Sequence, residues 1–420
     1  MRYASRSHLR RGRFILSAAA AVLPLSACVS AEQAPASALS GIEEVPSPAA
    51  EGSGEPHLSS SVDGPVLSWL EPAGEGRHEL KVSLWSEGRW SAPATVAGGD
   101  DWFVNWADFP SVVPVAPGVL VAHWLQRGGE GTYDYAVRVA RSSDGGATWT
   151  EPWTPHEDGT PTEHGFVSIF PEPAGGWGLV WLDGREYASA DGGEPSNEMT
   201  LRYRHVDAAG TPGGEVLVDG RICDCCQTDA AITSRGPLVV YRDRTHDEIR
   251  DVYVTRLVDG AWTEGAPLHA DGWHIGGCPV NGPAASARDD GVAVAWFTGA
   301  GDQPRVKVSF SSDAGGSFAP PIGVDDGNPA GRVDVELLED GSALVAWLER
   351  TGEGSAEVRV RRVWSDGRSG AASTVAASSS ARASGFPQMV GTADGTFVFA
   401  WTDVGDAGSR VRVARAAVPR

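Results

Sequence analysis

The sequence predicts an all-β protein built from seven copies of one unit, and two features of the chain support this prediction. Each copy has a short strand, a turn with glycine or aspartate, and an apolar strand ending in an aromatic residue, as in FPSVVPVAPGVLVAHWLQR and NGPAASARDDGVAVAWFTG. The copies also recur every 51 to 60 residues, which is typical of a repeat architecture. The aromatic residues that mark them are Trp69, Trp124, Trp181, Tyr241, Trp296, Trp347 and Trp401.

Each copy continues with a third alternating strand, such as YAVRVARSS or RVKVSFSS, and most copies add a short fourth strand. Four short strands per period, without helical periodicity, indicate the blade of a β-propeller. We therefore expect a seven-bladed β-propeller, or a six-bladed one if a terminal copy is not a true blade. The last copy ends after its third strand, so we expect the N-terminal segment GIEEVPS to supply the fourth strand and close the ring.

The N-terminus predicts export. Residues 1–27 hold a basic segment followed by the apolar run FILSAAAAVLPLSA, which has the pattern and length of a signal peptide. The segment LSAC resembles the lipobox of bacterial lipoproteins, which implies cleavage before Cys28 and lipidation of its thiol; an ordinary secretory signal is the alternative. Residues 28–40 then form a tether and residues 41–420 the propeller. In a Gram-negative cell, Val29 after the anchor, in place of the Asp associated with inner-membrane retention, favours the outer membrane, with the domain facing the periplasm or the cell surface.

The charge of the chain limits its partners. The formal net charge is −21 at pH 7, so nucleic acids and anionic membrane surfaces are not expected as partners. The bilayer is expected to be contacted through the Cys28 anchor only, and we expect a monomer. An exported chain lies where disulfides form and persist, which leaves four further cysteines to consider.

Two turns after third strands carry a sharper pattern. SSDGGATW and SSDAGGSF both match Ser-x-Asp-x-Gly-x-Thr/Ser-aromatic, the aspartate box or BNR repeat. In such a turn the aspartate accepts backbone N–H groups and glycine takes a positive φ. The chain thus resembles the sialidase (neuraminidase) superfamily of propellers, in which these boxes are structural. The matching residues are Ser142, Asp144, Gly146, Trp149, Ser311, Asp313, Gly315 and Phe318.

The resemblance implies a pocket in which arginines bind the carboxylate of a sialic acid and carboxyl groups assist hydrolysis. Sialidases also carry an Arg-Ile-Pro segment, whereas the corresponding region here reads DWFVNWADFP, without arginine. Such a mechanism requires no cofactor. The residues that fit these roles by type and by position in the loops are Arg185, Arg242, Asp243, Arg250 and Asp183.

The loops that lead into the first strand of each copy and those that leave the second strand are expected to meet at the channel mouth. Small-molecule sites form where loops converge on a concavity, so these loops are expected to bind the ligand. Aromatic side chains there can stack on a sugar ring or plug the channel. The expected ligand-binding residues are Trp102, Trp106, Asp108, His164, Arg244 and Asn281.

Four cysteines are also expected at the mouth. RICDCCQT precedes the first strand of the fourth copy, and GWHIGGCPVNGP that of the fifth, so the two loops should be neighbours. In one interpretation, Cys225 or Cys226 forms a disulfide with Cys278. In another, soft thiolates and an imidazole bind Cu or Zn. The residues concerned are Cys223, Cys225, Cys226, His274 and Cys278.

Two functional hypotheses follow. In the first, the chain is a sialidase-like propeller of the cell envelope that binds an acidic glycan or another small anionic ligand. If it is an enzyme, it hydrolyses the glycan as an exo-sialidase does. In the second, it is a non-enzymatic lipoprotein that binds Cu or Zn, or a protein partner, at the cysteine- and histidine-lined mouth.

Overall fold

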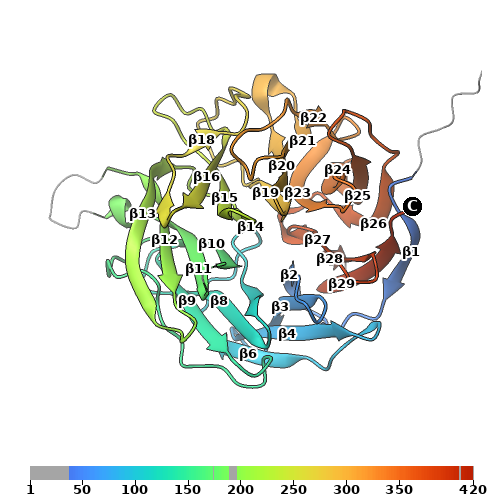
Figure 1. Cartoon of the computed structure of the whole chain (residues 1–420). Helices are drawn as coiled ribbons and strands as arrows, with labels where there is room; N and C mark the ends of the chain where they lie inside the picture. Colours follow the sequence, from blue (N-terminus) through green and yellow to red (C-terminus); the bar gives the residue numbers. More distant parts are fainter. Residues whose placement is uncertain (1–36, 174, 189–195, 406–407, 420) are drawn as a thin grey trace, which may run out of the picture. The chain divides into compact units, whose positions relative to one another are not determined.

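Seven antiparallel sheets follow one another around a central axis in the computed structural model of the chain (Figure 1). The structure describes residues 37–173, 175–188, 196–405 and 408–419. The expected signal peptide, Cys28 and most of the expected tether lie outside these residues. Within the described part of the chain, no helix has the length and apolar character needed to cross a membrane. The prediction of an all-β, seven-bladed propeller is confirmed.

The first three blades have the expected order, with the first strand innermost. Their strands are β2 (Gly54–Ser59), β3 (Val66–Pro72), β4 (His78–Ser86), β5 (Arg89–Trp90), β6 (Ala94–Gly99), β7 (Ser111–Ala116), β8 (Val119–Arg127), β9 (Tyr135–Ser142), β10 (His164–Pro171), β11 (Trp177–Asp183), β12 (Met199–Val206) and β13 (Pro212–Ile222).

The next three blades repeat the arrangement. Their strands are β14 (Asp229–Thr233), β15 (Gly236–Arg242), β16 (Val252–Val258), β17 (Ala261–Trp262), β18 (Ala266–Pro267), β19 (Ala284–Arg288), β20 (Gly291–Thr298), β21 (Arg305–Ser311), β22 (Ile322–Gly323), β23 (Pro329–Leu337), β24 (Ala343–Arg350), β25 (Ser355–Val363) and β26 (Ser373–Ser379). Short 3₁₀ turns are η1 (Arg185–Tyr187), η2 (Ala300–Asp302) and η3 (Arg382–Ser384).

The seventh blade joins the two ends of the described chain. Its strands are β27 (Gln388–Gly391), β28 (Thr396–Gly405), β29 (Gly408–Ala417) and the N-terminal β1 (Ser40–Val45). Strand β1 pairs antiparallel with β29, with Val45 opposite Val413, and the two lie side by side in Figure 1. An N-terminal strand therefore completes the last blade, and this pairing closes the ring.

The aromatic residues that mark the repeat lie in the core between blades. The side chains of Trp69, Trp181 and Trp347 are fully buried, and each indole N–H donates to a carboxylate two residues along the same strand. Burying an indole requires a partner for its N–H group, so this carboxylate belongs to the blade's architecture. The pairs are Trp69 with Glu71, Trp181 with Asp183, and Trp347 with Glu349.

Carboxylates in or just before the first strands bind the backbone of the next blade along the ring. Oδ1 of Asp108 accepts the backbone N–H of Phe166 at 2.7 Å, and Oδ2 of Asp229 accepts that of Ala285 at 2.8 Å. Asp334 makes the equivalent contact further around the ring. These hydrogen bonds explain how acidic side chains remain buried beside the channel, because a buried carboxyl group needs donors.

The two Ser-x-Asp-x-Gly turns make the same set of hydrogen bonds. The hydroxyl of Ser142 donates to Asp144 at 2.8 Å and accepts the N–H of Gly146 at 2.8 Å, and Ser311 and Asp313 repeat the pattern. Contacts with the Thr148 hydroxyl and backbone lower the pKa of Asp144 to about 2. Both turns lie beside the turn between the first and second strands of their blade, at the end opposite the loops that lead into the first strands.

Candidate functional site

Three cysteines lie in one tight loop between blades three and four. The loop begins directly after β13 and ends before β14, and the backbone N–H of Cys223 donates to the carbonyl of Arg242 at 3.0 Å. The connection from blade four to blade five passes next to it, where the N–H of Asn281 lies 3.4 Å from Sγ of Cys226. Cys278, on this second connection, is thereby brought close to the loop.

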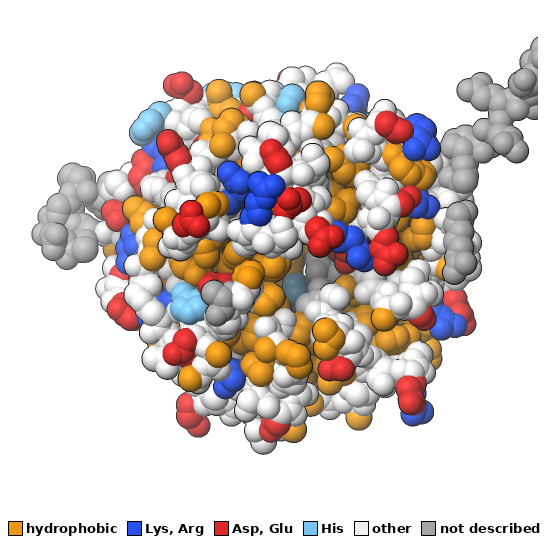
Figure 2. Space-filling model, viewed as in Figure 1, with side chains coloured by type: hydrophobic (Ala, Val, Ile, Leu, Met, Phe, Trp, Pro, Cys, Tyr) orange, Lys and Arg blue, Asp and Glu red, His pale blue; other side chains and the backbone are white. Residues whose placement is uncertain are grey.

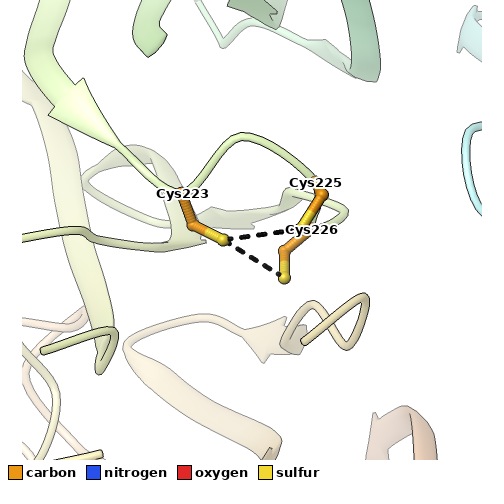
Figure 3. Close-up of side chains that lie close together, drawn as sticks. All are labelled: Cys223, Cys225 and Cys226. Carbon is orange, nitrogen blue, oxygen red and sulfur yellow. Dashed lines mark hydrogen bonds between the residues drawn. The ribbon is translucent and has the colours of Figure 1, made fainter. Parts of the chain in front are cut away.

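The sulfur atoms of the loop point toward one another (Figure 3). Sγ of Cys223 lies 3.6 Å from Sγ of Cys226 and 3.8 Å from Sγ of Cys225. A tetrahedral site with Zn–S distances of about 2.3 Å places its sulfur atoms about 3.8 Å apart. The spacing therefore fits one metal ion between the three thiolates.

The four cysteines of the described residues are free thiols, so the disulfide expected between Cys278 and the loop is not formed in this structure. Sγ of Cys278 lies 3.9 Å from Oδ1 of Asp224, and these two groups form a second trio with Cys225 whose ligand atoms all lie within 4.8 Å of one another. His274, expected as a ligand, is exposed and pairs through its backbone with Ile249. Asp224, which the sequence analysis did not single out, takes its place beside the sulfur atoms.

Positive charge faces the buried thiols. Nη1 of Arg250 lies 3.4 Å from Sγ of Cys223 and 3.0 Å from Oδ1 of Asp224. Burial opposes ionisation of Cys223, but contacts with the two neighbouring thiols and the charges of Arg250 and Arg242 hold its pKa well below the usual value. Burial raises the pKa of Cys226 to about 12. The cluster thus favours a thiolate at Cys223, the form that binds metals.

The arginines proposed for a carboxylate clamp are engaged within the protein. Arg242 is 2% exposed, and its guanidinium donates to the carbonyl oxygens of Arg250, Asn281 and Phe297. Arg244, which was expected to bind the ligand, donates to both carboxylate oxygens of Glu248. These contacts position loops against one another, and they occupy the groups that would otherwise bind an anion.

Arg185 and Asp183 form a forked ion pair, with Nε–Oδ1 and Nη2–Oδ2 distances of 2.7 Å. Asp183 also receives the indole N–H of Trp181, which is the contact that recurs in other blades. Asp183 therefore has a structural role, as the acceptor for the buried indole N–H of Trp181. The segments WLEP, WLDG and WLER carried this signal in the sequence.

A second cluster of ligand-type residues lies next to this pair. His156 and His164 stack with centroids 3.7 Å apart, and both rings place a nitrogen 3.2 Å from Oδ1 of Asp158. Nη2 of Arg185 lies 3.4 Å from the same oxygen and 2.7 Å from Asp183. The carboxylate of Asp158 thus already has three nitrogen partners, two imidazole rings and one guanidinium.

Asp108, expected to contact a ligand, shares a tyrosine with Glu163. The Tyr135 hydroxyl lies 2.9 Å from Oδ2 of Asp108 and 2.8 Å from Oε1 of Glu163. A hydroxyl has one hydrogen to donate, so one of the two carboxyl groups must itself be protonated to complete both bonds. Burial raises the pKa of Asp108 to about 7 and that of Glu163 to about 8, which is consistent with a retained proton.

The expected aromatic residues pack against the protein. Trp102 is buried and stacks on Trp124, and Trp106 stacks on Phe386 under the guanidinium of Arg332. They close the wall rather than presenting a free sugar-stacking face. The first strands line a central cavity of about 340 Å³, and the face shown in Figure 2 is hollowed at its centre.

Asn281 and Asp243 complete the residues expected at the mouth. The Oδ1 of Asn281 accepts the backbone N–H of Arg332 at 2.7 Å, so this side chain joins blades five and six. Asp243 is buried beside Tyr253, and burial raises its pKa to about 7. Both side chains thus serve contacts within the propeller wall.

No family model matches the sequence, and no curated protein matches it either. Among solved structures, the chain is similar to the GH93 α-L-arabinofuranosidase of Fusarium graminearum, with 13% identity over 75% of this chain and 94% of that chain and a TM-score of 0.48. It is also similar to the polysaccharide lyase Uly1, with 10% identity over 90% and 99% and a TM-score of 0.49. The Hadza microbial sialidase Hz136 gives 14% identity over 70% and 63% and a TM-score of 0.39. At these values the similarities assign no activity to this chain.

Proposed function

We propose that this chain binds a soft, thiophilic metal ion, Cu(I) or Zn(II), through the thiolates of Cys223, Cys225 and Cys226. The observation that carries the proposal is the spacing of the sulfur atoms, 3.6 and 3.8 Å from Cys223. Thiolates are preferred ligands of Cu(I) and Zn(II), whereas Mg²⁺ and Ca²⁺ prefer oxygen. The protein then acts as a metal-binding propeller, and catalysis is not required of it.

The surroundings of the sulfur atoms support this proposal. Arg250 and the backbone N–H of Asn281 both approach sulfur at 3.4 Å, and such outer hydrogen bonds orient thiolate ligands and offset their charge. The loop is held at both ends by blade strands, so its ligands lie on a rigid support. As part of the same proposal, the protein performs this function in the bacterial cell envelope, as the signal peptide expected in residues 1–27 and the lipid anchor expected at Cys28 suggest.

The proposal is tested by competition of the full chain with a chromophoric chelator for Cu(I) and, separately, for Zn(II), under anaerobic conditions. We expect Cys226→Ser to weaken binding at least tenfold, because it removes one of three thiolates. His274→Ala is the matched control, because His274 lies on a neighbouring loop outside the sulfur cluster, and it should bind as the wild type does. Equal affinity of wild type and Cys226→Ser would refute the proposal.

A second candidate function is hydrolysis of a glycan, and one observation favours it. Asp108 and Glu163 share the Tyr135 hydroxyl, and burial raises the pKa of Asp108 to about 7 and that of Glu163 to about 8. Glycoside hydrolysis uses a pair of carboxyl groups of which one is protonated. The resemblance to sialidases would make the substrate an acidic glycan. Release of a fluorogenic aglycone from a sialoside, abolished in Glu163→Gln, would support this function, and no release by the wild type would remove it.

A further inference from the structure

Two trios of ligand atoms at the mouth have one residue in common. Cys223, Cys225 and Cys226 form the first trio, and Asp224, Cys225 and Cys278 form the second. Within each trio the ligand atoms all lie within 4.8 Å of one another. Cys225 therefore belongs to both trios, and the second trio adds Cys278 from the neighbouring connection of the propeller.

The four sulfur atoms do not form one compact set in the described structure. A single tetrahedral ion would need all four at about 3.8 Å from one another. Cys278 instead groups with Cys225 and Asp224, on the outer side of the loop. One ion bound by four thiolates thus fits the arrangement less well than two ions with a shared ligand.

Resting on the proposed function, we propose that the mouth binds two thiophilic ions bridged by the Cys225 thiolate. The inner ion is bound by Cys223, Cys225 and Cys226, and the outer ion by Asp224, Cys225 and Cys278. A thiolate sulfur has more than one lone pair, so it can bind both ions. Each thiol that becomes a ligand releases its proton to solvent, and no electron transfer is involved.

Exposure of the ligands distinguishes the two positions. Cys223 and Cys226 are 1% and 2% exposed, Cys225 is half-buried, and Cys278 is exposed. An ion arriving from solvent therefore meets the outer trio first and reaches the inner trio by exchange of ligands through Cys225. The outer ion is the readily exchanged one, and the inner ion is shielded by the protein.

Arg250 links the two positions. Its Nη1 atom lies 3.4 Å from Sγ of Cys223 and 3.0 Å from Oδ1 of Asp224, so one guanidinium contacts a ligand of each ion. Five anionic ligands around two monovalent ions leave excess negative charge. The guanidinium offsets part of this charge where the two trios meet.

The inference is tested by anaerobic titration of the full chain with Cu(I), the more thiophilic of the two ions, followed by desalting and metal analysis. We expect two equivalents in the wild type, one in Cys278→Ser and two in His274→Ala. Because Cys278 is exposed, the serine variant should fold normally, which circular dichroism checks. A small chelator should remove copper from the wild type in two phases, and the fast phase should be absent in Cys278→Ser.

The outcomes separate this inference from the proposed function. One equivalent in both wild type and Cys278→Ser would overturn the two-ion site and leave the proposed function standing. Two equivalents in both would exclude Cys278 as a ligand and overturn the inference as well. No bound copper in the wild type would contradict the two-ion copper site, and no bound zinc in the parallel assay as well would contradict the proposed function.

Discussion

At the scale of single residues, the structure distinguishes side chains that are free to bind a ligand from those whose polar groups are used in contacts within the propeller. Arg242 is the clearest case, because an arginine in a loop at the mouth has the right chemistry for an anion. The structure surrounds it with three backbone carbonyl groups and with Trp273, 4.9 Å below the guanidinium. It holds blades four and five together and contacts the loop that carries Asn281.

Replacing Arg242 should therefore destabilise the protein. Arg242→Ala leaves buried carbonyl groups without donors and removes the packing against Trp273, so we expect a loss of roughly 2–4 kcal/mol in the free energy of unfolding. Arg244→Ala is the control, since Arg244 is a partly exposed partner of Glu248 and should cost under about 1 kcal/mol. Urea denaturation measures both; equal midpoints for the two variants would contradict the structural role.

Asp108 leads to a prediction about pH. Burial raises its pKa from 3.8 to about 7, so the folded state binds its proton more tightly than the unfolded chain does. The stabilising contribution is complete below about pH 4 and is lost as the pH rises toward 7. Asp108→Asn keeps the shape of the side chain but does not ionise.

We therefore expect Asp108→Asn to gain stability relative to the wild type between pH 4 and pH 7. Denaturation of both proteins across this range measures the difference, and the exposed Glu353→Gln serves as control. A difference that does not change with pH would show that Asp108 titrates normally in the folded protein.

At the scale of elements, strand β1 decides whether the ring is closed. It pairs with β29, and the residues just before it, Ala38 and Leu39, are 1% and 4% exposed in the core of the last two blades. Most of the contact therefore comes from backbone pairing and apolar burial. The exposed ion pair between Glu43 and Arg415 should add little.

Truncation tests this closure. A chain that begins at residue 37 should unfold at the same temperature as the longer chain, whereas one that begins at residue 46 lacks β1 and should melt at a clearly lower temperature. The loss follows from an unpaired β29 edge and an exposed apolar surface. Calorimetry measures both; unchanged melting without β1 would show that the other three strands of the last blade close the ring unaided.

At the scale of the whole molecule, the sequence predicted the architecture well because each blade is a local unit. The spacing of Trp69, Trp124 and their counterparts depends on strand and turn lengths within a blade, which one sequence shows directly. The order of strands likewise places Cys226 and Cys278 on neighbouring connections. The number of blades and the convergence of loops followed from these local features.

The partners of individual side chains were not predictable in the same way. The Tyr135 hydroxyl meets Asp108 and Glu163 from positions 27 and 28 residues away, across different blades, and no periodicity indicates such a contact. The choice between disulfide and metal also depends on atomic distances. The closeness of Asp224 to Cys278 was not predictable either, because no spacing pattern of cysteines marks the residue between them.

We propose above all that the loop holding Cys223, Cys225 and Cys226 binds a thiophilic metal ion. The most direct test is metal analysis with thiol counting on the full chain, purified without reductant. We expect bound copper or zinc, and free thiols at Cys223, Cys225, Cys226 and Cys278 once the metal is removed. Two disulfides and no metal would contradict it, and would assign the four cysteines to covalent links between neighbouring blades.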